Sequence, residues 1–215
     1  MVECVIFDLD GTLSRSGEGI KNSVKYALEK FGIYTNDDQL LSQMIGPPLI
    51  DGFVRYFGLT EQQAKQAVGF YRETYKVKGL YECDAYDGVV RMLSTLKNKG
   101  KKIYIATSKP YDYTLKVLKH LKIYEYFDSV EGAQMTTSTY DKKDIINLCI
   151  KSNDCPLESI VMVGDRKFDI QGAKDCNIRS VGVTYGYGDR SELLEYGADY
   201  IVDTVSQLEK LLLEI

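Results

Sequence analysis

The chain has 215 residues, of which 44% are hydrophobic and 27% charged, and its formal net charge is −4. This composition is typical of a soluble globular protein with enough residues for a full core and a smaller insertion. Lys and Arg (27) are outnumbered by Asp and Glu (31), which argues against a nucleic-acid-binding domain, because such domains present a basic face. A local site for a phosphorylated small molecule is compatible with this charge.

The five cysteines are scattered, odd in number and contain no Cys-x-x-Cys pair. This pattern argues against a disulfide framework or a zinc site and favours buried thiols in a reducing compartment. The N-terminus enters an apolar strand without a basic segment or a cleavage site, so we expect no signal peptide. No apolar stretch reaches the length of a membrane span. We therefore expect a cytoplasmic protein with no membrane partner.

The first predicted element is a buried strand that ends in two carboxylates. Residues 5–7 form an apolar run, and Asp8 and Asp10 follow directly at its end. Gly11 then marks a sharp change in chain direction. Because ligands bind at the carboxyl ends of strands in open α/β sheets, these two aspartates are candidate site residues.

The segment from about residue 17 to residue 79 is predicted to be helical, without a strand. An apolar face repeats with helical spacing over residues 20–31. Pro48 is a typical residue for the start of the next helix. A capping box at residues 60–63 precedes a third, longer helix. Together these signals predict a few antiparallel helices.

From residue 86 onward, predicted strands and helices alternate, which indicates a parallel sheet with helices on both faces. The strands are expected at 101–108, 128–132, 159–165, 179–184 and 199–203, and the helices at 89–96, 115–121, 141–151, 170–173 and the C-terminal end. The Thr-Thr-Ser-Thr run at 136–139 is expected to be a surface loop, and Thr-Tyr-Gly-Tyr-Gly at 184–188 a turn.

The first strand belongs to this later, alternating part of the chain. We therefore predict an α/β fold with a Rossmann-like parallel sheet core, formed by residues 1–14 and 84–215. Residues 15–83 are predicted to form an inserted, all-helical cap domain. An insertion directly behind a strand's carboxyl end is expected to lie over the active-site face.

Polar side chains of complementary kinds follow several of the predicted strands. Two or three carboxylates together with a substrate phosphate suit Mg²⁺, which takes hard oxygen ligands and keeps some water. Without a cation, these carboxylates would repel one another and their pKa values would rise. The side chains concerned are Asp8, Asp10, Thr107, Ser108, Lys109, Lys142, Lys143, Asp165 and Asp169.

Several of these residues also have a plain structural explanation. Asp165 could be the N-cap of a helix, with Asp169 as a solvated side chain. Thr107 or Ser108 could cap the helix that starts near residue 110. Lys142 in isolation resembles a surface lysine. Their position and order at successive strand ends favour the functional interpretation.

Four motifs of this sequence resemble those of the haloacid dehalogenase superfamily. They are Asp-Leu-Asp-Gly-Thr from residue 8, Thr-Ser-Lys from residue 107, a lysine at the start of a helix, and Gly-Asp-Arg-Lys-Phe-Asp from residue 164. The resemblance covers essentially the whole chain, including a helical cap after the first motif. It is closest to the phosphoglycolate phosphatase and 5′-nucleotidase-like branch.

The resemblance implies a Mg²⁺-dependent phosphatase that forms an aspartyl-phosphate. Asp8 is implied to be the nucleophile, and Asp10 the acid and base, with its backbone carbonyl on the metal. Asp165 is implied to ligate the metal directly, and Asp169 through water or through Lys142. The implied metal-binding set is therefore Asp8, Asp10, Asp165 and Asp169.

The resemblance also implies how the phosphate is held. Thr107, the backbone N–H of Ser108 and the turn at Gly11 are implied to bind the phosphoryl oxygens, and Lys142 to offset charge on the phosphate and on Asp8. Relatives often carry this lysine in a Lys-Pro context, which is absent here, so Lys143 is the competing choice. Arg15 is a further departure, because relatives often have an acidic residue there.

Substrate specificity is expected to come from the cap. The break at Gly-Pro-Pro (46–48) suggests a loop that reaches the site, with Pro47 and Leu49 as candidate contacts. Arg55 is a candidate second contact for a phosphate or a carboxylate. We expect the partner to be a small phosphorylated metabolite, such as phosphoglycolate or a nucleoside 5′-monophosphate.

Two alternative functions share part of this pattern. A sugar phosphomutase of the β-phosphoglucomutase type has the same catalytic motifs and returns the phosphoryl group to a sugar. A response-regulator receiver domain also groups aspartates, a hydroxyl and a lysine at a sheet edge, but it has no cap and its phosphoacceptor follows a middle strand. The sequence leaves the physiological substrate and the oligomeric state, monomer or homodimer, open.

Overall fold

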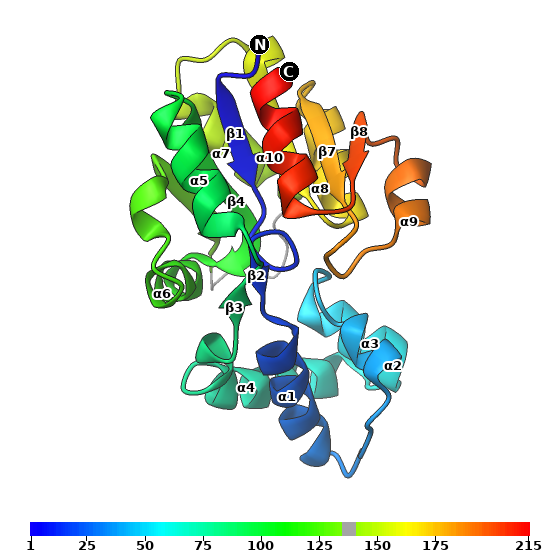
Figure 1. Ribbon diagram of the computed structural model, residues 1–215. Coiled ribbons are helices and arrows are strands. Elements are labelled where there is room, and N and C mark those ends of the chain that lie inside the picture. Colours follow the sequence, from blue (N-terminus) through cyan, green and yellow to red (C-terminus); the bar gives the residue numbers. More distant parts are fainter. Residues whose placement is uncertain (135–140) are drawn as a thin grey trace. The chain divides into compact units, whose positions relative to one another are not determined.

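The computed structural model describes residues 1–134 and 141–215. Its central feature is a six-stranded, wholly parallel sheet with the strand order β5-β4-β1-β6-β7-β8 (Figure 1). This architecture confirms the predicted α/β class with a parallel sheet. The strands are β1 (Cys4–Phe7), β4 (Lys102–Pro110), β5 (Ser129–Ala133), β6 (Ile160–Gly164), β7 (Arg179–Val183) and β8 (Tyr200–Val202).

β1 occupies the middle of the sheet, and its register decides which side chains meet at the sheet's carboxyl edge. Phe7 at the end of β1 is paired with Ile105 of β4 on one side and with Val163 of β6 on the other. All residues of β1 and β6 are buried, as expected for parallel strands covered on both faces. The segments that follow β1, β4 and β6 therefore leave the sheet side by side.

Helices cover both faces of the sheet, with α5 and α10 on one face and α7 and α8 on the other (Figure 1). On the α7 and α8 face, Ile145 and Ala173 belong to a buried apolar cluster with side chains of β1, β4 and β6. The helices of this part of the chain are α5 (Val89–Asn98), α6 (Tyr111–His120), α7 (Lys142–Lys151), α8 (Lys167–Asp175), α9 (Arg190–Glu195) and α10 (Val205–Glu214), with short 3₁₀ turns at Tyr124–Tyr126 and Leu157–Ser159.

The chain divides into two compact units, of which residues 1–15 and 85–215 form the first and residues 16–84 the second. The second unit is helical and contains no strand between residues 17 and 79, as predicted. Its helices are α1 (Gly17–Glu29), α2 (Asp38–Ser42), α3 (Leu49–Phe57) and α4 (Glu61–Tyr75), followed by a 3₁₀ turn at Gly79–Tyr81. That this unit acts as a cap stays a prediction.

The residues predicted to begin two of these helices lie at the helix N-termini. Pro48 is the N-cap of α3, and Thr60 and Gln63 form a reciprocal capping box at the start of α4. The box satisfies backbone donors of the first turn that no carbonyl within the helix can reach. α1 and α4 pack against each other within this unit.

Several short elements were not predicted. α2 and α9 each begin after one aspartate, Asp37 and Asp189, whose side chain accepts the backbone N–H of the third helical residue. β2 (Ser14–Arg15) and β3 (Asp84–Ala85) form a separate two-stranded sheet where the chain passes between the units. β4 extends two residues beyond its predicted end. The loop expected at residues 136–139 lies outside the described residues.

No helix within residues 1–134 and 141–215 combines the length and the apolar character that crossing a membrane requires.

Candidate active site

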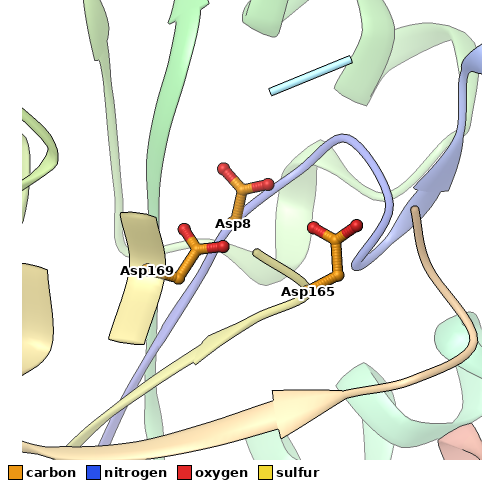
Figure 2. A group of neighbouring side chains, drawn as sticks. All are labelled: Asp8, Asp165 and Asp169. Carbon is orange, nitrogen blue, oxygen red and sulfur yellow. The ribbon is translucent and has the colours of Figure 1, made fainter. Parts of the chain in front are cut away.

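Three buried carboxylates gather at the carboxyl edge of the sheet. Asp8 follows β1, Asp165 follows β6, and Asp169 lies in the first turn of α8 (Figure 2). One oxygen from each carboxylate lies within 4.8 Å of the other two. The N-cap of α8 is Arg166 and not Asp165, and Asp169 is buried, so the alternative of a capping Asp165 with a solvated Asp169 is wrong.

Lys142 supplies a positive charge to this cluster. It is the first residue of α7, and its ammonium Nζ lies 2.5 Å from Oδ1 of Asp8 and 2.7 Å from Oδ1 of Asp169. Its neighbour Lys143 is only half-buried. The geometry therefore favours Lys142 over Lys143 for the role that the sequence left open between them.

The charges of the cluster are not balanced. Burial and the Asp169 and Asp10 carboxylates raise the pKa of Asp8 to about 6, against the lowering effect of Lys142. Burial, together with Asp169 and Asp8, also raises the pKa of Asp165 well above its ordinary range. Although burial lowers the pKa of Lys142, its two carboxylate partners raise it further, so this side chain is a permanent cation. With all three carboxylates ionised, one lysine leaves two negative charges uncompensated.

The Asp10 carboxylate lies outside this cluster and pairs with a lysine of β4. Its Oδ2 lies 2.8 Å from Nζ of Lys109, and both side chains are largely buried. The other oxygen of Asp10 is buried and has no hydrogen-bond partner among the described residues. Lys109 was noted in the Thr-Ser-Lys motif but not assigned a role, since sequence alone does not reveal a partner on another strand.

The predicted phosphate-binding residues lie at the same edge of the sheet. Thr107, near the end of β4, is buried, and its Oγ1 accepts the backbone N–H of Lys109 at 3.3 Å. Ser108 is exposed, which leaves its surroundings open to a ligand. Gly11 has a φ of +86°, and a Cβ there would lie 2.6 Å from Cγ of Asp165. Only glycine therefore allows the chain to turn this close to the carboxylates.

A loop that we predicted only as a turn also reaches the cluster. The backbone N–H of Tyr187 donates a hydrogen bond of 2.7 Å to Oδ2 of Asp165. Oδ1 of Asp165 is buried and has no partner among the described residues. The sequence feature that could have indicated this close approach is the pair of closely spaced glycines, Gly186 and Gly188.

Comparison with known proteins gives the family. The sequence pattern of the haloacid dehalogenase-like hydrolases matches residues 5–183, which include all four motifs. The chain belongs to this family. The match to a hydrolase family over most of the chain argues against the receiver-domain alternative.

Relatives of this hydrolase have related but different activities. It is 34% identical over 208 residues to a 5′-nucleotidase of Pseudomonas aeruginosa, covering 97% of this chain and 94% of the relative. It is 32% identical to the tyrosine-protein kinase PtkA of Mycobacterium tuberculosis, covering 97% of this chain and 71% of the kinase. A solved structure described as a "predicted phosphatase" from Clostridium acetobutylicum superimposes with a TM-score of 0.94 at 41% identity over the full length of both chains. The protein is a phosphatase of this family that acts on small phosphoesters.

The carboxylate cluster of this hydrolase fits a divalent cation. Its donor set consists of oxygens only, which suits a hard ion such as Mg²⁺. Oδ1 of Asp165 is a buried acceptor without a partner in the described chain, which is costly unless a ligand satisfies it. A charge of +2 would also offset the two negative charges that Lys142 leaves.

The predicted specificity residues belong to the second unit of this hydrolase. Leu49 begins α3 and is half-buried, Pro47 lies just before it, and Arg55 is exposed in the last turn of the same helix. The guanidinium of Arg55 lies over the ring of Tyr56, with 5.6 Å to the ring centroid. Their role in substrate selection stays a prediction.

Proposed function

We propose that this phosphatase hydrolyses a small phosphomonoester through an aspartyl-phosphate on Asp8, with Mg²⁺ as cofactor. The observation that carries the proposal is the buried Asp8 carboxylate, paired with Lys142 at 2.5 Å beside Asp165 and Asp169. A nucleophile held in this way approaches an anionic phosphate only if its own charge and that of the phosphate are offset. Mg²⁺, when bound, would supply the largest part of this compensation, and Asp8, Asp165 and the Asp10 backbone carbonyl would hold it.

In the first step, an oxygen of Asp8 attacks phosphorus and forms a new O–P bond. The bond from phosphorus to the substrate's ester oxygen breaks, and Asp10 donates its proton to that leaving oxygen. Thr107 and the backbone N–H of Ser108 bind the phosphoryl oxygens during the transfer. Lys142 stays between Asp8 and Asp169 and keeps the nucleophile oriented.

In the second step, water attacks phosphorus of the aspartyl-phosphate and gives a proton to Asp10. The bond between phosphorus and Asp8 breaks, which releases inorganic phosphate and restores both carboxyl groups. Lys109, 2.8 Å from Asp10 Oδ2, holds this side chain where it can exchange the proton. The two-step route divides one difficult displacement into two easier ones.

The second unit is proposed to select the substrate, with Pro47, Leu49 and Arg55 as candidate contacts. This part of the proposal rests on the family resemblance. Phosphoglycolate and nucleoside 5′-monophosphates are the substrates to test first, and similarity to a 5′-nucleotidase supports the second class. If Leu49 contacts the substrate, Leu49→Ala will change the ratio of rates between substrates.

The test is Mg²⁺-dependent phosphate release from a panel of phosphomonoesters, with wild type and Asp8→Asn assayed side by side. We expect turnover by the wild type only, loss of turnover on removal of Mg²⁺, and one preferred substrate class. Absence of phosphate release from every ester would overturn the proposal. Conversion of a sugar phosphate into its isomer in place of hydrolysis would instead support the mutase alternative.

A further inference from the structure

Asp165 is held differently from the other two carboxylates of the cluster. Asp8 and Asp169 share the ammonium of Lys142, whereas Oδ2 of Asp165 accepts the backbone N–H of Tyr187 at 2.7 Å. The second oxygen, Oδ1, is buried and unpartnered within the described chain. One oxygen of this carboxylate is therefore fixed by the protein, and the other is available to a ligand.

The N–H of Tyr187 comes from residues 184–188, here called the clamp loop. This loop reaches Asp165 only because two of its residues lack a side chain. A Cβ on Gly186 would lie 2.5 Å from Oδ2 of Asp165, and a Cβ on Gly188 would overlap the Asp165 backbone carbonyl. Neither glycine has a φ in the left-handed region. A larger residue is therefore excluded at these positions because its Cβ would collide with Asp165, and not because of backbone strain.

The clamp loop is also fixed at its other side. The Tyr185 hydroxyl donates a hydrogen bond of 3.0 Å to the backbone carbonyl of Thr12. The Tyr185 ring packs edge-on against the ring of Tyr86, with 4.9 Å between the centroids. The loop therefore joins Asp165 to the segment that directly follows Asp10.

We propose that the clamp loop positions Asp165 for the metal, with Gly186 and Gly188 as the positioning residues. The Tyr187 N–H occupies Oδ2 and leaves Oδ1 to face the cation. The inference rests on the proposed function, since it requires that a divalent cation binds at this site. It adds that metal affinity depends on a loop that contributes no ligand of its own.

The test is calorimetric titration of the full-length, metal-free protein with Mg²⁺ alone. We expect Gly186→Ala and Gly188→Ala to weaken Mg²⁺ binding by about 10- to 100-fold, as loss of support for a metal ligand typically does. Tyr187→Phe keeps the backbone donor and should bind Mg²⁺ as the wild type does. In the two glycine variants, raising the Mg²⁺ concentration should restore phosphate release.

Gly182→Ala is the matched control. It adds the same methyl group to β7, the strand that leads into the clamp loop, but its Cβ would meet the Leu193 side chain at 2.9 Å and not Asp165. It is expected to lose some stability and to keep wild-type Mg²⁺ affinity. Unchanged affinity in both Gly186→Ala and Gly188→Ala would overturn the inference, as would an equal loss in Gly182→Ala. Weak binding by Tyr187→Phe would overturn the assignment to the backbone N–H.

A second measurement applies if the glycine variants do not fold. In the wild type, the amide NMR signal of Tyr187 should shift as Mg²⁺ is added. The Mg²⁺ concentration at the midpoint of this shift should agree with the dissociation constant from calorimetry. A Tyr187 amide that does not respond to bound Mg²⁺ would overturn the inference but leave the proposed function standing. A wild type that binds no Mg²⁺ would overturn both.

Discussion

Lys142 forms ion pairs with two of the three buried carboxylates, so its removal should affect both stability and turnover. Lys142→Met leaves Asp8 and Asp169 buried without their shared cation. We expect the free energy of unfolding to fall by about 3–5 kcal/mol and kcat by about 10²- to 10³-fold. Urea unfolding and phosphate release measure the two effects.

Lys143→Met is the control for this change, because Lys143 is half-buried on the same helix turn. Its expected effect on stability is within about 0.5 kcal/mol. A larger loss of activity in Lys143→Met than in Lys142→Met would reverse the assignment of the two lysines.

Asp165 should be a source of instability in the metal-free protein. Asp165→Asn keeps an oxygen for the Tyr187 N–H but removes a buried negative charge, so it should stabilise the metal-free protein by about 1–3 kcal/mol. Mg²⁺ is expected to raise the melting temperature of the wild type, and Asp165→Asn should abolish that rise. Asp199→Asn is the contrasting variant, because Asp199 accepts hydrogen bonds from both the N–H and the hydroxyl of Ser180. It should lose stability and keep the Mg²⁺ response, and equal behaviour of the two variants would contradict this account.

The raised pKa of Asp8 gives a pH dependence of defined sign. Its value of about 6 in the folded protein exceeds the ordinary 3.8, so the folded state binds the proton more tightly than the unfolded state. The resulting stability is complete below about pH 4 and is lost as the pH rises through about 6. Lys142, Asp169 and Asp10 act on this carboxyl, and Asp165 interacts with it as well.

We therefore expect metal-free wild type to lose stability relative to Asp8→Asn as the pH rises over this range. Urea midpoints in the presence of a chelator measure the difference, and Mg²⁺ at neutral pH should reduce it. A difference that stays constant with pH would show that Asp8 titrates normally.

At the scale of elements, the sequence predicted the long and strongly patterned ones. β1 and β6 were readable because each is an uninterrupted apolar run, and α4 because Thr60 and Gln63 form a capping box ahead of a long helix. α2 and α9 were missed, because helices of five and six residues are too short for an apolar period to repeat. A single capping aspartate before each was the only signal.

The capping box of α4 offers a test at this scale. Thr60→Ala removes the acceptor for the Gln63 N–H and should lower the free energy of unfolding by about 1 kcal/mol. Gln66→Ala, at an exposed position inside the same helix, should cause no loss. Urea unfolding of both variants checks this, and equal stability would show that the box contributes nothing.

Contacts within the site were less predictable than the elements that carry them. Asp8, Asp165 and Asp169 were predicted as a group because Asp8 and Asp165 directly follow strands and Asp169 belongs to the same motif as Asp165. The pairing of Asp10 with Lys109 and of Asp165 with the Tyr187 N–H depends on strand register and loop shape. Neither appears as a local pattern, since the partners are far apart in the sequence.

For the molecule as a whole, the proposed function assigns the chemical step to the first unit and the choice of substrate to the second. Relatives at 32–34% identity include a 5′-nucleotidase and a tyrosine-protein kinase, so identity at this level does not fix what receives or donates the phosphoryl group. The first unit holds the carboxylates and lysines, and the second holds Pro47, Leu49 and Arg55. Substitutions in the second unit are therefore expected to change substrate preference more than the rate of the chemical step.

In the proposed mechanism the phosphoryl group passes through Asp8, and the decisive experiment is to trap it on that residue. Wild type mixed with Mg²⁺ and a labelled substrate, then quenched in acid within one turnover, should carry the label on the peptide that contains Asp8. The label should disappear during a chase with unlabelled substrate and should be absent from Asp8→Asn. Rapid phosphate release without any labelled protein, or a label that persists in Asp8→Asn, would contradict the account.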